Sequence, residues 1–168
     1  NNKQIKSLIK DVCVQMGDKY AKKEALDIVY ATGLVESKYE YIEQIGKGPA
    51  RSFWQVEPST AVDNCKNFIS SRPELLQASA DILGIDPYYF IDANIDDWDW
   101  ILRTNISAGI LHCRIKYWRI PEPIKEGKEE LAKYSAVVFS DYDKGFLKNI
   151  DIKNIIDHIK SIDKDLNI

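Results

Sequence analysis

The sequence predicts a mainly α-helical protein, and three observations support this fold class. Apolar residues recur at three- and four-residue steps in several segments, which is the spacing of a buried helix face. Proline and glycine stand at the ends of these segments, where they start and stop helices. Only one short β-branched run, residues 136–139, is typical of a buried strand. With 168 residues, the chain is long enough for one domain with a sizeable core.

Two amphipathic helices are predicted at the N-terminal end. The first spans residues 3–16 and stops at Gly17. The second spans about residues 20–38, and its apolar residues predict one buried face. Glu36 stands where this apolar pattern ends, so its carboxylate is expected to be partly desolvated. Desolvation favours the protonated form that a general acid needs. The alternative is a solvated residue in the last helical turn.

A loop and a short extended segment are predicted next. Residues 45–52 contain glycines and Pro49, which let the backbone turn close to a ligand. This loop is not a phosphate-binding loop, because the lysine–serine pair that follows the glycines of such loops is missing. Residues 53–56 are expected to be extended and to return beside the helix end, with Gln55 facing a polar substrate. Trp54 either offers a stacking face for a sugar ring or fills the core.

Proline marks the start of the following helices. Pro58, with Ser59 or Thr60 as a capping residue, predicts a helix that runs to about residue 70. The next helix spans residues 73–83 and is stopped by glycine. Residues 86–99 are rich in aromatic residues and aspartate, a combination that suits sugar binding but also fits a helix connection with ordinary capping aspartates.

A long helix is predicted over about residues 98–119, with Asn105 on its apolar stripe. His112 lies on or near the same stripe and is interpreted as a hydrogen-bonded helix residue rather than a catalyst. Another short helix is predicted over residues 125–134. Beyond it the character of the sequence changes, and residues 135–168 predict a strand, a turn and a helix. We therefore divide the chain into residues 1–134 and a C-terminal extension, 135–168.

Composition limits the classes of ligand. The formal net charge of −3 does not favour binding to a polyanion, so nucleic acid is not expected as the main ligand. Three isolated cysteines and two isolated histidines predict buried reduced thiols rather than disulfides, and neither a metal site nor a cofactor. No apolar run is long enough to span a membrane, and no signal peptide is visible. A chain that starts with Asn1 instead of Met is expected to be a fragment or a trimmed form.

Several short blocks occur in the order found in the lysozyme-like superfamily. They are Glu36-Ser37, Gly48-Pro49-Ala50, Ser52-Phe53-Trp54-Gln55, Pro58-Ser59-Thr60 and Asn105-Ile106 with Gly109 and Leu111. Over about residues 10–134 the chain resembles soluble lytic transglycosylases and goose-type lysozymes, and it is most similar to the transglycosylase-like proteins of tailed bacteriophages. The chain departs from the family where Ser52-Phe53-Trp54 replaces the usual Gly-Leu-Met.

The resemblance implies a peptidoglycan-cleaving enzyme that breaks the β-1,4 bond between N-acetylmuramic acid and N-acetylglucosamine. Glu36 is the implied general acid and base. In lytic transglycosylases one glutamate plays both roles, and the sugar's own 6-hydroxyl group attacks to give a 1,6-anhydro product. A lysozyme that uses two carboxylates is the alternative, with Glu40, Glu43 or Glu57 as the second. Candidate substrate-binding residues are Ser37, Tyr41, Trp54, Gln55, Glu57, Asn105 and Tyr134.

The implied partners are glycan strands of the cell wall and other phage virion proteins. The implied location is the virion or the infected bacterium, with action at the periplasm or cell wall. Residues 135–168 depart from this family, and Val137–Leu147 resembles a piece of ribokinase-like heptose-phosphate kinases. Because the anion-binding glycines and the catalytic aspartate region of such kinases are missing, no kinase activity is expected. The departure keeps a second function open, that of an inactive lysozyme-like structural or wall-binding module.

Overall fold

The structure of the protein, a computed structural model, describes residues 1–121. In this part of the chain it is mainly helical, as the sequence predicts. The α-helices in chain order are α1 (Asn2–Met16), α2 (Lys23–Ser37), α3 (Pro58–Asn67), α4 (Pro73–Leu83), α5 (Pro87–Asp92), α6 (Ile95–Thr104) and α7 (Ile106–Trp118), with short 3₁₀ helices η1 (Asp18–Tyr20) and η2 (Ile69–Ser71). None of these helices is long and apolar enough to cross a membrane.

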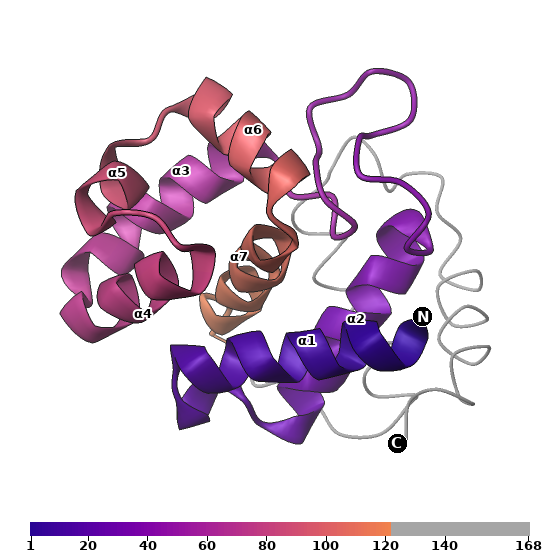
Figure 1. The fold of residues 1–168 in the computed structure, drawn as a ribbon, viewed down its shortest axis with the longest axis horizontal. Coiled ribbons are helices and arrows are strands. Elements are labelled where there is room, and N and C mark those ends of the chain that lie inside the picture. Colours follow the sequence, from indigo (N-terminus) through magenta and orange to yellow (C-terminus); the bar gives the residue numbers. More distant parts are fainter. Residues whose placement is uncertain (122–168) are drawn as a thin grey trace.

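Helix α7 lies at the centre of the molecule, between α1 and α2 on one side and α3 to α6 on the other (Figure 1). Most of its side chains are buried, which explains why it carries apolar residues on all sides. Residues 38–57 join α2 to α3 as a long loop (Figure 1), and Arg51 of this loop pairs with Asp99 of α6 at 2.6 Å. The described chain is therefore two groups of helices around one central helix, with a loop beside α2.

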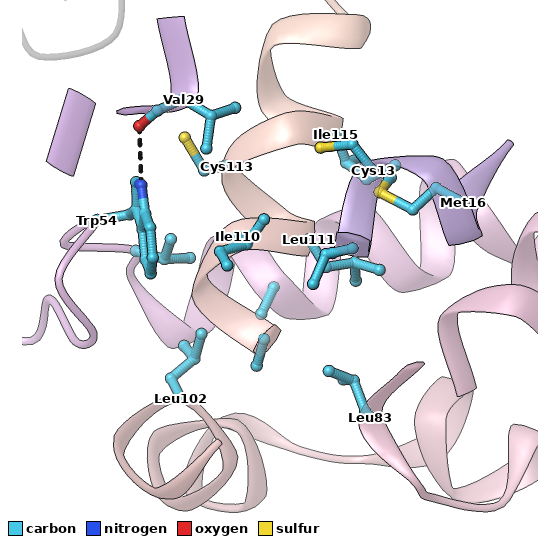
Figure 2. Packing of buried hydrophobic residues seen from close by; sticks show 14 of the residues in the cluster. Cys13, Met16, Val29, Trp54, Leu83, Leu102, Ile110, Leu111, Cys113 and Ile115 are labelled. Atoms are coloured by element: carbon cyan, nitrogen blue, oxygen red, sulfur yellow. Dashed lines mark hydrogen bonds between the residues drawn. The ribbon is translucent and has the colours of Figure 1, made fainter. Parts of the chain in front are cut away.

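The hydrophobic core surrounds α7 on several sides (Figure 2). Ile110, Leu111 and Ile115 of α7 are fully buried. Cys13 of α1 and Cys113 of α7 belong to the same cluster, and these two cysteines and Cys65 are buried free thiols, which confirms that prediction. Burial raises the pKa of Cys13 to about 11, so this thiol stays protonated and unreactive at neutral pH.

The prediction of one continuous helix over residues 98–119 is wrong, because the helix is interrupted at Asn105. The backbone of Asn105 is extended, and its side-chain oxygen accepts a hydrogen bond from the N–H of Ser107 at the start of α7. Its side-chain nitrogen donates to the carbonyl oxygen of Leu83, 3.0 Å away. Asn105 is therefore a helix cap and not a member of a continuous apolar stripe.

The predicted extended segment over residues 53–56 is also wrong. These residues form a tight turn, which is closed by backbone hydrogen bonds of 2.8 Å in both directions between Arg51 and Val56. The backbone of Ser52 and of Gln55 has positive φ angles, 66° and 50°. No strand longer than an isolated bridge occurs in residues 1–121.

The other helices have the predicted bounds or differ from them by a few residues. Helix α4 has the predicted bounds and ends at Gly84, whose φ of 69° places it in the left-handed region. Helix α3 begins at Pro58 as predicted, but Glu57 and not Ser59 or Thr60 occupies the capping position. The predictions for Tyr134, for the helix over 125–134 and for the extension 135–168 lie outside the described residues.

Candidate active site

Glu36 lies in the last turn of α2, half-buried, where the chain reverses sharply. Lys38 and Tyr39 both adopt left-handed backbone conformations, with φ angles of 53° and 57°. The hydroxyl group of Ser37 donates to the carbonyl oxygen of Gly33 and accepts from the N–H of Tyr39. Local hydrogen bonds thus cap the C-terminal end of α2, and they fix the backbone that carries the Glu36 side chain.

Tyr39 folds back along α2 and holds this reversal in place. Its hydroxyl group donates to the carbonyl oxygen of Tyr30 at 2.8 Å, and its ring lies against Gly33, where a Cβ atom would clash with it. The rings of Tyr30 and Tyr39 stack at 5.6 Å. Burial raises the pKa of the Tyr39 hydroxyl far above its usual range, so it remains a donor. Gly33 is therefore required by the close approach of a side chain.

Glu36 lines a surface cavity of about 290 Å³, which we call the Glu36 cavity. Its walls come from α2, the loop 38–57, the first turn of α3 and the second half of α7. The lining residues are Thr32, Glu36, Tyr41, Gln44, Ile45, Pro49, Ala50, Trp54, Gln55, Val56, Glu57, Thr60, His112, Cys113, Lys116 and Tyr117. Its volume lies near the lower end of the range of about 300–1,000 Å³ that is typical of small-molecule sites.

A hydrogen-bonded pair joins α2 to α7 at the wall next to Glu36. Thr32 is one turn before Glu36, and its hydroxyl group donates to the carbonyl oxygen of Ile28 at 2.7 Å. Its oxygen is also 2.7 Å from the hydroxyl oxygen of Tyr117, which is therefore the donor in that bond. This pair fixes the distance between the two helices that carry the wall.

The turn 51–56 forms another wall and is anchored in the core by Trp54. The indole N–H of Trp54 donates to the carbonyl oxygen of Val29 in α2 at 2.8 Å (Figure 2). The turn also packs closely on α7, because a Cβ atom at Gly109 would clash with Ser52 and Trp54. The side-chain nitrogen of Gln55 donates to the carbonyl oxygen of Ser52 at 2.8 Å, which orients this amide within the turn.

Five of the residues predicted for the site line this one cavity: Glu36, Tyr41, Trp54, Gln55 and Glu57. Trp54 is only 2% exposed, so the core-filling interpretation describes it better than a free stacking face for a sugar. Tyr41 donates from its hydroxyl group to the backbone oxygen of Glu36 at 2.6 Å. Burial, followed by the charges of Glu36 and Glu40, raises the pKa of Tyr41.

Two predicted substrate-binding residues lie elsewhere. Ser37 is 1% exposed and makes the two backbone hydrogen bonds that close α2, so its hydroxyl group has no route to a ligand in the Glu36 cavity. Asn105 caps α7 and contacts Leu83, away from the cavity. Both positions fit helix capping, which polar residues at helix ends commonly perform.

The three glutamates considered as a second catalytic carboxylate differ in whether they line the Glu36 cavity. Glu57 lines the Glu36 cavity, where its exposed side chain stands at the start of α3. Glu43 does not line it and instead lies 4.0 Å from Arg51 and 3.9 Å from Arg103. Glu40 is exposed and is also absent from the walls. Of the three candidates, only Glu57 is placed to share a ligand with Glu36.

Helix α7 contributes polar wall residues that the sequence analysis did not predict: Cys113, Lys116 and Tyr117. Together with His112 they occupy two successive turns of one helix face. The signal in the sequence was a set of polar residues inside an otherwise apolar helix, which marks either a capped core group or a cavity wall. His112 itself is fully buried, and burial lowers its pKa to about 3, so it is neutral.

No group of three or more His, Cys, Asp or Glu side chains within residues 1–121 is arranged to hold a metal ion. The wall of the Glu36 cavity presents two carboxylates, a lysine, two tyrosine hydroxyls and the two side-chain amides of Gln44 and Gln55. A comparison with protein-family models finds none that matches the chain, and comparisons with curated proteins and solved structures find no match either.

Proposed function

We propose that the protein is a muralytic enzyme that cleaves the β-1,4 bond between N-acetylmuramic acid and N-acetylglucosamine in peptidoglycan. The observation that carries the proposal is the position of Glu36, half-buried in a cavity whose wall also contains Gln55. These residues are 19 positions apart in the sequence. They meet because Trp54 ties the turn 51–56 to α2. The resemblance of these blocks to the lysozyme-like superfamily agrees with this arrangement.

In the proposed reaction Glu36 gives a proton to the glycosidic oxygen of the leaving sugar. The bond from that oxygen to the anomeric carbon of N-acetylmuramic acid breaks, and positive charge develops on the sugar ring. Glu36, now a carboxylate, takes a proton from the 6-hydroxyl group as its oxygen bonds to the anomeric carbon. Gln55 and Tyr41 are proposed to bind the sugar, and the tyrosine hydrogen bond to the backbone of residue 36 positions the glutamate.

Glu57 supports a variant of the same function. It is the only second carboxylate on the cavity wall among the described residues, and a lysozyme would use it to activate water. The single-glutamate mechanism remains the preferred one, because Glu57 is exposed and stands at the capping position of a helix. An exposed side chain at this place is weakly oriented toward a ligand.

The test is mass spectrometry of the soluble muropeptides that the protein releases from purified peptidoglycan. Anhydro-muropeptides are expected from the parent protein, and Glu36→Gln is expected to lower the rate by at least about a hundredfold. Glu57→Gln keeps the charge change but leaves Glu36 in place, so it is the matched control and retains most of the activity.

Two results would change the proposal. Products with reducing ends, lost in both variants, would replace the transglycosylase with a two-carboxylate lysozyme. No release by a folded parent protein would rule out the enzyme and leave the wall-binding module, which sedimentation with insoluble peptidoglycan then tests.

A further inference from the structure

Residues 44–50, which we call the wall loop, build one side of the Glu36 cavity without an anchor in the hydrophobic core. The cavity-lining residues of this loop are Gln44, Ile45, Pro49 and Ala50. Of residues 44–50 only Ala50 is buried, and Ile45 is 76% exposed. The turn that follows has Trp54 in the core, but the wall loop carries no side chain of that kind. Polar contacts must therefore hold it in place.

Gln44 closes the wall loop on itself. Its backbone N–H donates to the carbonyl oxygen of Ala50 at 3.0 Å, and its side-chain oxygen accepts from the N–H of Ala50 at 3.1 Å. The same side chain occupies the space next to Gly48, where a Cβ atom would clash with it. Lys47 has a left-handed backbone with a φ of 66°, a strain that these contacts must offset. They fix the shape of the loop but not its place relative to the helices.

Arg51 connects the wall loop to α6. Its Nη1 donates to the carbonyl oxygens of Gly48 and Ala50 at 2.7 and 2.9 Å. Its Nε lies 2.6 Å from Oδ1 of Asp99 in α6. The side chains of Arg51 and Asp99 are 19% and 28% exposed, so water screens this ion pair less than one on the open surface. One guanidinium group thus contacts two carbonyl groups of the loop and one carboxylate of a helix.

Asp99 is itself held firmly. Its neighbours Trp98 and Leu102 are 0% and 1% exposed and fix α6 in the core. Its Oδ2 accepts a hydrogen bond from Arg103 at 3.1 Å, which leaves Oδ1 to face Arg51. A carboxylate on a packed helix with both oxygens engaged is a well-oriented partner. Helix α6 does not line the Glu36 cavity, yet it is linked to the cavity wall through Arg51.

We propose that Arg51 and Asp99 are positioning residues of the Glu36 cavity. This inference rests on the proposed function. Neither side chain lines the cavity, so neither is placed to touch the sugar. Asp99 fixes Arg51, and Arg51 fixes the wall loop before the glycan strand binds. A wall that is already ordered does not have to be ordered during binding, so the link lowers KM.

The test measures kcat and KM on soluble glycan strands for the parent, Arg51→Gln, Asp99→Asn and the double variant. Arg51→Gln is expected to raise KM about tenfold and to change kcat less than about threefold, because the loop must then be ordered by the ligand. A smaller folded fraction would lower kcat and leave KM unchanged, so a raised KM separates positioning from lost stability. Asp99→Asn keeps the two carbonyl contacts of Arg51 and is expected to raise KM about fivefold.

The double variant shows whether Asp99 acts through Arg51. If it does, the double variant has the KM of Arg51→Gln alone, since the two residues form one chain of contacts. Arg72→Gln is the matched control and keeps the parent KM. Arg72 also donates from Nη1 to a backbone carbonyl oxygen, that of Phe68 at 2.8 Å, but it does not line the Glu36 cavity. An unchanged KM in Arg51→Gln, additive rises in the double variant, or an equal rise in Arg72→Gln would overturn the proposal.

Amide hydrogen exchange tests the same link without turnover. Exchange at the N–H groups of Gln44 and Ala50 is expected to be about tenfold faster in Arg51→Gln and in Asp99→Asn, and exchange in α4 is expected to stay at the parent rate. Faster exchange in Arg51→Gln alone would remove Asp99 from the proposal. If exchange is faster in both variants but the parent cleaves no strand, the proposed reaction fails and the link stands. If the parent cleaves strands and exchange is unchanged in Arg51→Gln, the reaction stands and the link fails.

Discussion

Residues 38–57 and residues 58–105 differ in what determines their structure. In the second stretch local signals start the helices, for example Pro58 and Pro73 at first positions and the capping box that begins at Asn94. The first stretch has left-handed backbone at non-glycine residues: Lys38, Tyr39, Lys47, Ser52 and Gln55. Each such residue costs about 1–2 kcal/mol that distant contacts must offset. The loop that builds the Glu36 cavity therefore depends on partners far away in the sequence.

The substitution Trp54→Ala is expected to have the largest effect on stability, because Trp54 anchors residues 38–57 in the core. Loss of a buried tryptophan and of its hydrogen bond to Val29 is expected to lower the free energy of unfolding by about 3–5 kcal/mol. Muropeptide release is expected to fall as well, since Gln55 sits on the same turn. Urea denaturation followed by circular dichroism measures the stability.

Trp100→Ala is the matched control for this experiment. Trp100 belongs to the second stretch and is 60% exposed, so its loss is expected to cost less than about 1 kcal/mol. Equal losses for the two tryptophans would contradict the view that the loop depends on a single core anchor.

The pH dependence of stability tests His112 of α7, which lies between the Glu36 cavity and the second stretch. His112 borders the Glu36 cavity and also contacts Asn64, Phe90 and Trp98 of the second stretch. Burial lowers its folded-state pKa to about 3, below the value of about 6.5 in the unfolded chain. Between these values the unfolded chain binds one more proton, so stability falls as the pH falls.

At pH 5 this single histidine is expected to have removed about 2 kcal/mol of the stability present at pH 7. The measurement is urea denaturation at both pH values for the parent and for His112→Gln, and the difference between the two proteins cancels the titration of the carboxylates. Parallel losses in the two proteins would show that His112 does not titrate in this way.

The smallest effect is expected for a local signal of the second stretch. The carboxylate of Asp86 accepts hydrogen bonds from the backbone N–H groups of Tyr88 and Tyr89 at the start of α5. Asp86→Ala is expected to cost about 1 kcal/mol and to leave muropeptide release unchanged, because α5 does not line the Glu36 cavity. Thermal unfolding measures the loss. Asp92→Ala, at the other end of α5, is the control, and an effect as large as that of Asp86→Ala would rule out capping as the cause.

Residues of the helical scaffold were predictable because their signals are local. The bounds of α4 follow from Pro73 and Gly84 alone. Asn105 shows the limit of this reasoning, since an asparagine in a long apolar pattern reads equally as a helix residue or as a cap. The contact of its side chain with Leu83, 22 positions earlier, settles that choice, and periodicity does not report such a contact.

The candidate site was predictable in part for a similar reason. Glu36 and Gln55 belong to short blocks with a recognisable order, and the cavity gathers them together with Glu57. Ser37 belongs to the same block but points into the backbone of α2, because a hydroxyl group at a helix end is as well suited to capping as to binding. Lys116 and Tyr117 were missed, since their place on the wall depends on how α7 packs against α2.

The amino-acid sequence by itself determined the helical class, the main helices and the ordered set of polar residues around Glu36. These follow from periodicity, proline, glycine and short-range spacing, all of which act over a few residues. Only the tertiary structure decided the left-handed turn at Ser52 and Gln55, the burial of Trp54, and the packing of α7 that brings Lys116 and Tyr117 to the wall of the Glu36 cavity. These features arise where segments far apart in the chain pack together, because the contacts that stabilise them form only between the two segments.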